Sequence, residues 1–414
     1  MAILADTSFP GLLSAEVARD PYAFYRRLRA EAPLHWDEGA QAYLLTRHAA
    51  VSTGYRHPAF TTRNYEWQLE PVFGRSLLQM GGGEHSRKRA LVSPHFRGAG
   101  LDAWSGTIHR NVAQILDGTV ERAVDILLDP VQSGEEFDLL TRFAHYLPVF
   151  VIADMLDLPR SDYRRFWGWY NAMIAFLSNL ARDSVVHDAG VRATRELREY
   201  LGPIVAARRA DPGSDLISVL TTAEFEGQSL GDDEIMTHVT QLLNAGSETT
   251  DKTIGSLFAH LLIERERYEE VHDDRSLVVP AISETLRLTP PSQMNGRVLA
   301  EDVEIEGGVL PEGSTVYLVI ASANRDERRF ADPEVYDMHR TDLSHQDAFS
   351  ARGEHFAFGH GRHFCLGAML ARAELTVALG AVLDRFPDLR LAPDFVPHEA
   401  GLKMRATAEL RVVA

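Results

Sequence analysis

The chain has 414 residues, of which 45% are hydrophobic and 24% charged, a balance typical of a globular protein. Its formal net charge of −17 argues against nucleic-acid binding, which requires a basic surface. There is no run of about 18 apolar residues and no basic segment leading into an apolar one, so we expect neither a membrane span nor a signal peptide. The single cysteine, Cys365, excludes an intramolecular disulfide and fits a cytoplasmic location; a lone cysteine is by default a small buried hydrophobe.

The first half of the chain predicts mainly helices. Residues 14–32 predict a helix, and apolar residues at 34–36 and 42–46, around the turn Asp37-Glu38-Gly39, predict a β-hairpin. Helical periodicity follows at 101–127, 138–157, 161–180 and 187–209. The sequence Asp211-Pro212-Gly213 then ends the helical pattern.

The second half predicts one long helix, a small β region and a final helix. Acidic residues 232–234 favour a helix start there, and the pattern continues to about Arg265, a length of roughly 50 Å at 1.5 Å per residue. The remaining predicted segments are a helix at 278–288, β-strands within 296–307 and 314–319, an irregular stretch at 325–357 and a helix from just after Cys365 to about Asp384. No shift in composition marks a linker, so we predict one domain, 1–414, mainly α with a small β region.

A glycine-rich loop surrounds the cysteine. Residues 358–367 read Phe-Gly-His-Gly-Arg-His-Phe-Cys-Leu-Gly. Glycines permit tight turns and a close approach to a flat group, and a cysteine just before a helix N-terminus lies in a field that favours the thiolate, the form that binds iron. The loop resembles FGxGxHxCxG, the haem-binding loop of the cytochrome P-450 superfamily, at every fixed position.

That resemblance implies a fold and a cofactor. It implies the cytochrome P-450 fold, with haem b (iron protoporphyrin IX) between the long central helix and the helix after the cysteine loop. Cys365 would be the axial ligand to the haem iron, His363 would bind a haem propionate and Phe358 would pack beside the sulfur. Gly359 and Gly367 would bring the backbone close to the haem.

A second motif lies inside the long helix, at Ala245-Gly246-Ser247-Glu248-Thr249-Thr250. An interior glycine costs a helix about 1 kcal/mol relative to alanine, and a threonine there can bond back to the carbonyl four residues earlier, so together they predict a local opening. The segment resembles the oxygen-activation motif AGxxT of the same superfamily. The resemblance implies that Ala245 and Gly246 make room for dioxygen, that Thr249 hydrogen-bonds it, and that Glu248 relays protons. Alone, Glu248 would be a solvated surface charge.

The resemblance implies roles for two further sets of residues. Glu284 and Arg287, with the spacing of a common surface ion pair, match the superfamily's ExxR pair, and Arg340 matches the second arginine, so the three imply a role in folding. His85 and Arg89 share one helix face and resemble the HxxxR element that binds haem propionates, and Arg297 lies at the spacing of another propionate ligand.

The substrate cavity of the superfamily implies a further set of positions in this chain. They are Trp67, Leu69, Phe73, Leu77, Met80, His238, Leu242, Asn244, Gln293, Met294, Asn295, Leu402 and Met404. The set is mostly apolar with a few polar groups, as ligand pockets are. The three amides would bind a carbonyl, amide or hydroxyl of the substrate, or would be satisfied within the protein.

The expected reaction is oxidation of a small organic molecule, a secondary-metabolite intermediate, with O2 as the oxidant. Because the chain has no flavin, nicotinamide or iron–sulfur module, we expect a ferredoxin and a ferredoxin reductase to supply electrons to a monomeric enzyme. Basic residues near the predicted thiolate side are a candidate docking surface: Arg87, Lys88, Arg97, Arg110, Arg352, Arg362 and Arg372.

Other functions remain open from the sequence. The same cofactor supports coupling, ring closure or desaturation without oxygen insertion, and a peroxide-driven enzyme is a third possibility, which the pair Glu248-Thr249 disfavours. A haem-binding sensor would not need the motif at 245–249, and a haem-free helical scaffold would leave the cysteine loop unexplained.

Overall fold

The computed structural model describes residues 9–116, 131–177, 179 and 183–414. The chain divides into two compact units. Unit 1 comprises Met1–Asn64, Gly255–Ala368 and Val396–Glu409, and unit 2 comprises Tyr65–Ile254, Met369–Phe395 and Leu410–Ala414. The long helix α12 (Asp232–Ile263) contributes to both units and ends within two residues of its predicted end.

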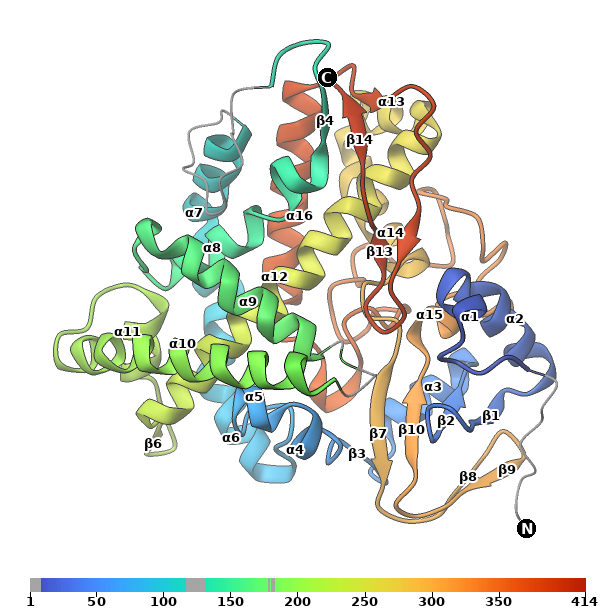
Figure 1. Ribbon diagram of the computed structural model, residues 1–414, viewed down its shortest axis with the longest axis horizontal. Helices are drawn as coiled ribbons and strands as arrows, with labels where there is room; N and C mark the ends of the chain where they lie inside the picture. Colours follow the sequence, from blue (N-terminus) through green and yellow to red (C-terminus); the bar gives the residue numbers. More distant parts are fainter. Residues whose placement is uncertain (1–8, 117–130, 178, 180–182) are drawn as a thin grey trace. The chain divides into compact units, whose positions relative to one another are not determined.

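Unit 1 is built on a five-stranded sheet of order β1-β2-β10-β7-β3. The strands are β1 (Leu34–Asp37), β2 (Ala42–Leu45), β3 (Phe60–Thr61), β7 (Asn295–Leu299) and β10 (Thr315–Leu318). β1 and β2 pair antiparallel with Leu34 opposite Leu45, which confirms the predicted hairpin. β10 runs parallel to β2 and antiparallel to β7, as Figure 1 shows for the last two.

The sheet of unit 1 is covered on both faces, so every residue of β2 is buried. Side chains alternate between the faces of a strand. Leu45 accordingly packs with Val51 of α3 (His48–Arg56), whereas Leu44 packs with Leu28 of α2 (Pro21–Glu31). The remaining elements of unit 1 are α1 (Ala15–Arg19), α13 (Arg265–Asp273), α14 (Val278–Leu288), α15 (Ile320–Ala323), β8 (Val303–Ile305), β9 (Gly308–Leu310), β12 (Glu399–Ala400) and β13 (Ala406–Thr407).

The predicted helix at 14–32 is two helices, α1 and α2. They separate at Asp20, whose carboxylate accepts hydrogen bonds from the backbone N–H groups of Tyr22 and Ala23 and so caps α2. Pro21 follows at the first position of α2, where its missing N–H is not needed. The Asp-Pro pair therefore starts a new helix inside a continuous helical pattern.

Unit 2 is mainly helical. Its elements up to α10 are α4 (Tyr65–Gln68), α5 (Glu70–Phe73), α6 (Gly82–Val92), α7 (Gly98–Leu116), β4 (Glu136–Asp138), the π-helical turn η2 (Leu140–Ala144), α8 (Leu147–Met155), α9 (Tyr163–Leu177) and α10 (Ser184–Ala210). After these come α11 (Leu216–Thr222), β5 (Glu224–Phe225), β6 (Gln228–Ser229), the first part of α12, α16 (Ala368–Arg385), β11 (Arg390–Leu391) and β14 (Arg411–Val413). The helices predicted at 101–127 and 161–180 have parts outside the described residues.

The predicted helix at 138–157 proved to be three elements, β4, η2 and α8. β4 pairs antiparallel with β14, so that Phe137 lies opposite Val412 near the end of the chain. A strand whose partner lies that far along the sequence leaves no local periodic signal. The described helices include none with the length and apolarity needed to cross a membrane.

Candidate functional site

The cysteine loop is held by backbone geometry that requires glycine. Gly359 and Gly361 have φ angles of 67° and 68°, in the left-handed region that favours glycine. A Cβ atom at Gly361 would lie 2.9 Å from the carbonyl oxygen of Tyr55. The N–H of Cys365 donates to the carbonyl of Phe358 at 2.9 Å, which closes the loop. The exposed Cys365 side chain is thereby held three residues before α16 begins.

Aromatic rings fix Phe358 at the start of this loop. The ring of Phe358 lies 5.5 Å from that of Phe349, 6.1 Å from that of His355 and 6.3 Å from that of Phe364, centroid to centroid. His363 is half-buried, as is Gly367. All the loop residues predicted from the sequence therefore lie in one structured segment of unit 1.

Arg297 tests whether the site fits a haem. It lies on β7 with 4% of its surface exposed, and one guanidinium nitrogen donates to the carbonyl of Gly296. The same guanidinium lies 5.2 Å from the ring centre of Tyr55. Within the described residues, no carboxylate forms an ion pair with it. A buried cation without a carboxylate is costly, and an external carboxylate, such as a haem propionate, would supply the missing partner.

The motif at 245–250 lies in the part of α12 that belongs to unit 2. The hydroxyl of Thr249 donates to the carbonyl of Ala245 at 2.8 Å, the back-bonding predicted from the sequence. A Cβ atom at Gly246 would approach Ile152 of α8 to 3.3 Å, so the glycine permits close helix packing. The helix is nevertheless continuous from Asp232 to Ile263, so the predicted local opening is not a break in α12.

Glu248 is not a solvated surface charge. Only 5% of its surface is exposed, and its carboxylate pairs with the ammonium of Lys252 at 3.2 Å, one turn along α12. Asp251 follows on the next turn and binds the ring of His145, which adjoins η2. Sequence reasoning did not select His145 and Asp251, because their pairing joins segments more than 100 residues apart.

The other two predicted propionate ligands lie in unit 2. His85 and Arg89 are on α6, one turn apart; His85 is buried and Arg89 is half-buried. The predicted spacing on one helix face is confirmed. Cys365, His363 and Arg297, the other predicted haem ligands, belong to unit 1.

Glu284, Arg287 and Arg340 meet in the interior of unit 1. The Glu284 carboxylate accepts from Arg287 at 2.7 Å through both oxygens and from Arg340 at 3.2 Å. Neither Glu284 nor Arg287 has any exposed surface. The three residues are therefore buried, whereas the spacing of Glu284 and Arg287 alone would suggest an ion pair at the surface.

The predicted cavity residues are buried to different degrees. Phe73, Leu77, Met80, His238, Asn244, Gln293 and Met294 are buried, and Leu242, Leu402 and Met404 are half-buried. In unit 1 the structure joins two of the predicted segments, because Ser292 forms a β-bridge with Met404 and the N–H of Gln293 donates to Lys403. Trp67 differs: α4 buries none of its residues, and Trp67 is 56% exposed.

The polar members of this set are partly satisfied inside the protein. The side-chain N–H groups of Asn244 and Gln293 donate to the carbonyls of Thr240 and Pro290, whereas their side-chain oxygens have no partner among the described residues. Asn295 donates to the hydroxyl of Tyr55 at 2.9 Å. Burial lowers the pKa of His238 to about 4, with Glu234 opposing and Lys88 assisting, so its ring is neutral near pH 7.

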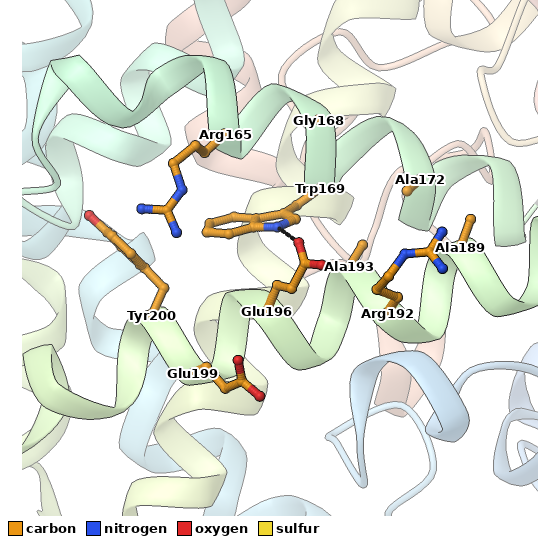
Figure 2. A pocket seen from close by; sticks show the side chains of 10 residues that line it. All are labelled: Arg165, Gly168, Trp169, Ala172, Ala189, Arg192, Ala193, Glu196, Glu199 and Tyr200. Atoms are coloured by element: carbon orange, nitrogen blue, oxygen red, sulfur yellow. Dashed lines mark hydrogen bonds between the residues drawn. The ribbon is translucent and has the colours of Figure 1, made fainter.

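A groove of about 650 Å³ lies between α9 and α10 of unit 2, and it contains none of the predicted cavity residues. Figure 2 shows the Arg165 guanidinium beside the rings of Trp169 and Tyr200, at 4.9 and 5.1 Å from their centres. The indole N–H of Trp169 donates to Glu196 at 2.9 Å. These polar groups are thus engaged with each other.

Comparisons with known proteins agree along the chain. Residues 38–394 match the family model described as Cytochrome P450. The chain is 36% identical over 403 residues to pulcherriminic acid synthase of Bacillus subtilis (strain 168), covering 97% of this chain and 96% of that protein. It is 35% identical over 412 residues to nocardicin C N-oxygenase of Nocardia uniformis subsp. tsuyamanensis, covering 96% of each. The crystal structure of CYP109E1 from Bacillus megaterium with testosterone has a TM-score of 0.80, at 30% identity over 95% of this chain and 99% of that one.

These matches extend over both units and include every candidate segment. They agree with the loop around Cys365 and with the buried Arg297, both of which suit a haem with its carboxylates. The chain belongs to the cytochrome P450 family and is a haem-b-dependent monooxygenase that acts on small molecules with O2.

Proposed function

We propose that this monooxygenase hydroxylates or otherwise oxidises a secondary-metabolite intermediate, with electrons from a ferredoxin and its reductase. The observation that carries the haem-thiolate assignment is the loop in which Gly359 and Gly361 hold an exposed Cys365 just before α16. The test is the absorption spectrum of the purified protein after dithionite and carbon monoxide. A strongly red-shifted Soret band supports the proposal, and an imidazole-type band would contradict it.

Specific residues would hold the haem. Cys365 would ligate the iron, Arg297, His85, Arg89 and His363 would bind the propionates, and Phe358, Gly359 and Gly367 would form the surface against the haem. The buried guanidinium of Arg297 supports this assignment, since a propionate would neutralise it. When bound, a thiolate-ligated haem supplies the chemistry of dioxygen reduction and oxygen transfer to the substrate.

Glu248 and Thr249 would move protons into the site. The Thr249 hydroxyl donates to Ala245, which leaves the lone pairs of its oxygen to accept a hydrogen bond from an incoming donor. Glu248 is buried beside Lys252, so its carboxylate can receive a proton and pass it on without competition from bulk water. The chain's own contribution would thus be a proton relay through two adjacent residues of α12.

The Thr249→Ala variant tests this role. We expect product formed per NADH consumed to fall by about a hundredfold, the lower end of what a positioned acid–base group contributes, while NADH consumption continues. Thr240→Ala is the matched control, because Thr240 makes the same bond to the carbonyl four residues earlier on the same helix. Undiminished coupling in Thr249→Ala would remove this residue from oxygen activation.

The names of two relatives support the substrate class, since one is a synthase of pulcherriminic acid and the other an N-oxygenase of nocardicin C. The unpartnered side-chain oxygens of Asn244 and Gln293 would accept hydrogen bonds from substrate N–H or O–H groups. A screen of such compounds by shift of the Soret band would find ligands, and labelled dioxygen would then distinguish oxygen insertion from coupling, ring closure or desaturation. The predictions of a monomer and of a cytoplasmic location stay predictions.

The ferredoxin proposal rests on exposed cations. Lys88 and Arg352 of the predicted set pair with Glu234 and Asp347, so they contribute little net charge. Arg110 is exposed on α7, and its one described contact is with the hydroxyl of Thr107. Arg110 is therefore a member of the set that can meet an acidic partner.

Charge reversal at Arg110 tests the docking surface. We expect Arg110→Glu to slow reduction by an acidic ferredoxin about tenfold at low salt, with the difference shrinking as salt screens the charges. The control is Arg192→Glu on α10, which makes the same charge change at an exposed position outside the set. Equal rates and equal salt dependence in Arg110→Glu and the wild type would rule out this docking surface.

A further inference from the structure

A second carboxylate of α12 lies one turn beyond Glu248 and has a partner from another segment. Asp251 accepts from the Nδ1 atom of His145, with its two oxygens at 2.8 and 2.9 Å. Because a carboxylate only accepts, Nδ1 carries the proton in this pair. His145 follows the π-helical turn η2. The backbone N–H of His145 donates to the carbonyl of Leu140 at 3.0 Å, and this bond closes the turn. The pair thus fastens η2 to α12 within unit 2.

Exposure decreases from this pair toward Glu248. The side chain of His145 is 31% exposed and that of Asp251 is 12% exposed. On the same stretch of helix, the side chain of Lys252 is 26% exposed and that of Glu248 only 6%. Ionisable groups therefore lead from solvent-accessible atoms to a buried carboxylate, over a single turn of α12.

Tyr170 of α9 shows that the two carboxylates share one environment. Burial, followed by the charges of Asp251 and Glu248, holds the pKa of its phenol well above its usual range. The ring therefore lies within the field of both carboxylates and keeps its proton.

We propose that His145 and Asp251 form the solvent-facing end of the proton path to Glu248. This inference rests on the proposed function, in which Glu248 relays protons toward the substrate site. A water molecule gives a proton to Nε2 of His145, and the proton on Nδ1 moves to the Asp251 carboxylate. Asp251 then gives its proton to Glu248, so that one proton leaves solvent and one arrives at Glu248. Neither residue is catalytic, since each acts through Glu248.

The groups facing His145 tune it for this exchange. Burial lowers its pKa, but the hydrogen bond and the charge of Asp251, together with the charge of Asp138 on β4, outweigh burial and the opposing Lys252. The pKa of His145 is therefore raised above 6.5. At neutral pH its ring carries the second proton, and with it a positive charge, more often than the ring of an ordinary histidine does. The Trp167 ring lies 6.1 Å from the ring of His145, and Arg142, one turn earlier along the chain, pairs with Glu135.

The test uses the haem-loaded enzyme with a plant-type ferredoxin and its reductase, under air and without added substrate. NADH oxidation by the wild type should be fastest at low pH and should fall as pH rises through the raised pKa of His145. We expect His145→Gln to oxidise NADH at least threefold more slowly than the wild type, with a rate that no longer decreases over this pH range. In Asp251→Asn the decrease in rate should occur at lower pH. Nitrogen-15 NMR titration of the His145 ring should show the same downward pKa shift in Asp251→Asn.

His187→Gln is the matched control, because His187 pairs with Asp188 at 3.1 Å on the exposed face of α10 in the same unit. It should keep the wild-type rate and pH profile. A folded His145→Gln variant with the wild-type rate and pH profile would overturn the inference, as would an equal loss in His187→Gln. Unchanged behaviour in Glu248→Gln would instead refute the relay of the proposed function, and absence of the red-shifted carbon monoxide band in the wild type would refute the haem-thiolate site itself.

Discussion

Replacing Cys365 with alanine is expected to abolish the red-shifted Soret band of the reduced, carbon monoxide-bound protein and to abolish substrate oxidation. The chain has no other cysteine, so no other residue can supply a thiolate. The loop itself should persist, because its closing bond runs from the backbone N–H of residue 365 and its shape depends on Gly359 and Gly361. The effect should therefore be chemical and not a consequence of unfolding.

Two measurements separate these causes. Circular dichroism and the midpoint of urea unfolding should place the apo forms of Cys365→Ala and the wild type close together, since the alanine fits wherever the exposed cysteine did. The carbon monoxide spectrum should differ completely. A red-shifted band that survives in Cys365→Ala would mean that the iron is not held by this residue.

How much of the site the sequence predicts depends on whether the signal is local. The loop at 358–367 and the motif at 245–250 are contiguous, and the predicted glycine turns and the bond from Thr249 to Ala245 are present, although the predicted local opening is not a break in α12. The pairing of His145 with Asp251 is different, because it depends on how η2 packs against α12. No spacing rule within either segment indicates it.

The same distinction holds for the fold. Helix α14 has the bounds predicted for it, 278–288, because its apolar periodicity and the following Pro290-Pro291 are local signals. β4 was predicted to be the start of a helix, since its strand character comes from pairing with β14 at the other end of the chain. At Asp20 the sequence Asp-Pro is a local signal for a helix start. The prediction missed it because the apolar pattern continues across the cap that separates α1 from α2.

The second large effect is expected at Glu284. Glu284→Gln keeps the size of the side chain and removes its charge, which leaves the buried guanidinium of Arg287 without a carboxylate and leaves Arg340 with Asp342 alone. Breaking a buried ion pair from one side typically costs about 3–5 kcal/mol, against a total stability of about 5–15 kcal/mol for a folded protein. We expect Glu284→Gln to lose a large fraction of its stability, measured as a lower midpoint of urea unfolding and a lower yield of folded protein.

The control for this variant lies on the surface. Glu264 and Arg267 are also three residues apart, and their charged atoms lie 2.8 Å from each other, but Glu264 is 59% exposed. Glu264→Gln should change stability by less than about 1 kcal/mol, because Glu264 is exposed to water and Arg267 keeps its hydrogen bond to the carbonyl of His260. Spacing and distance are nearly equal in the two pairs, so the expected difference comes from the burial of Glu284 and from its second arginine partner, Arg340. If both variants unfolded at the same urea concentration, Glu284 would contribute no more to stability than a residue of a surface ion pair does.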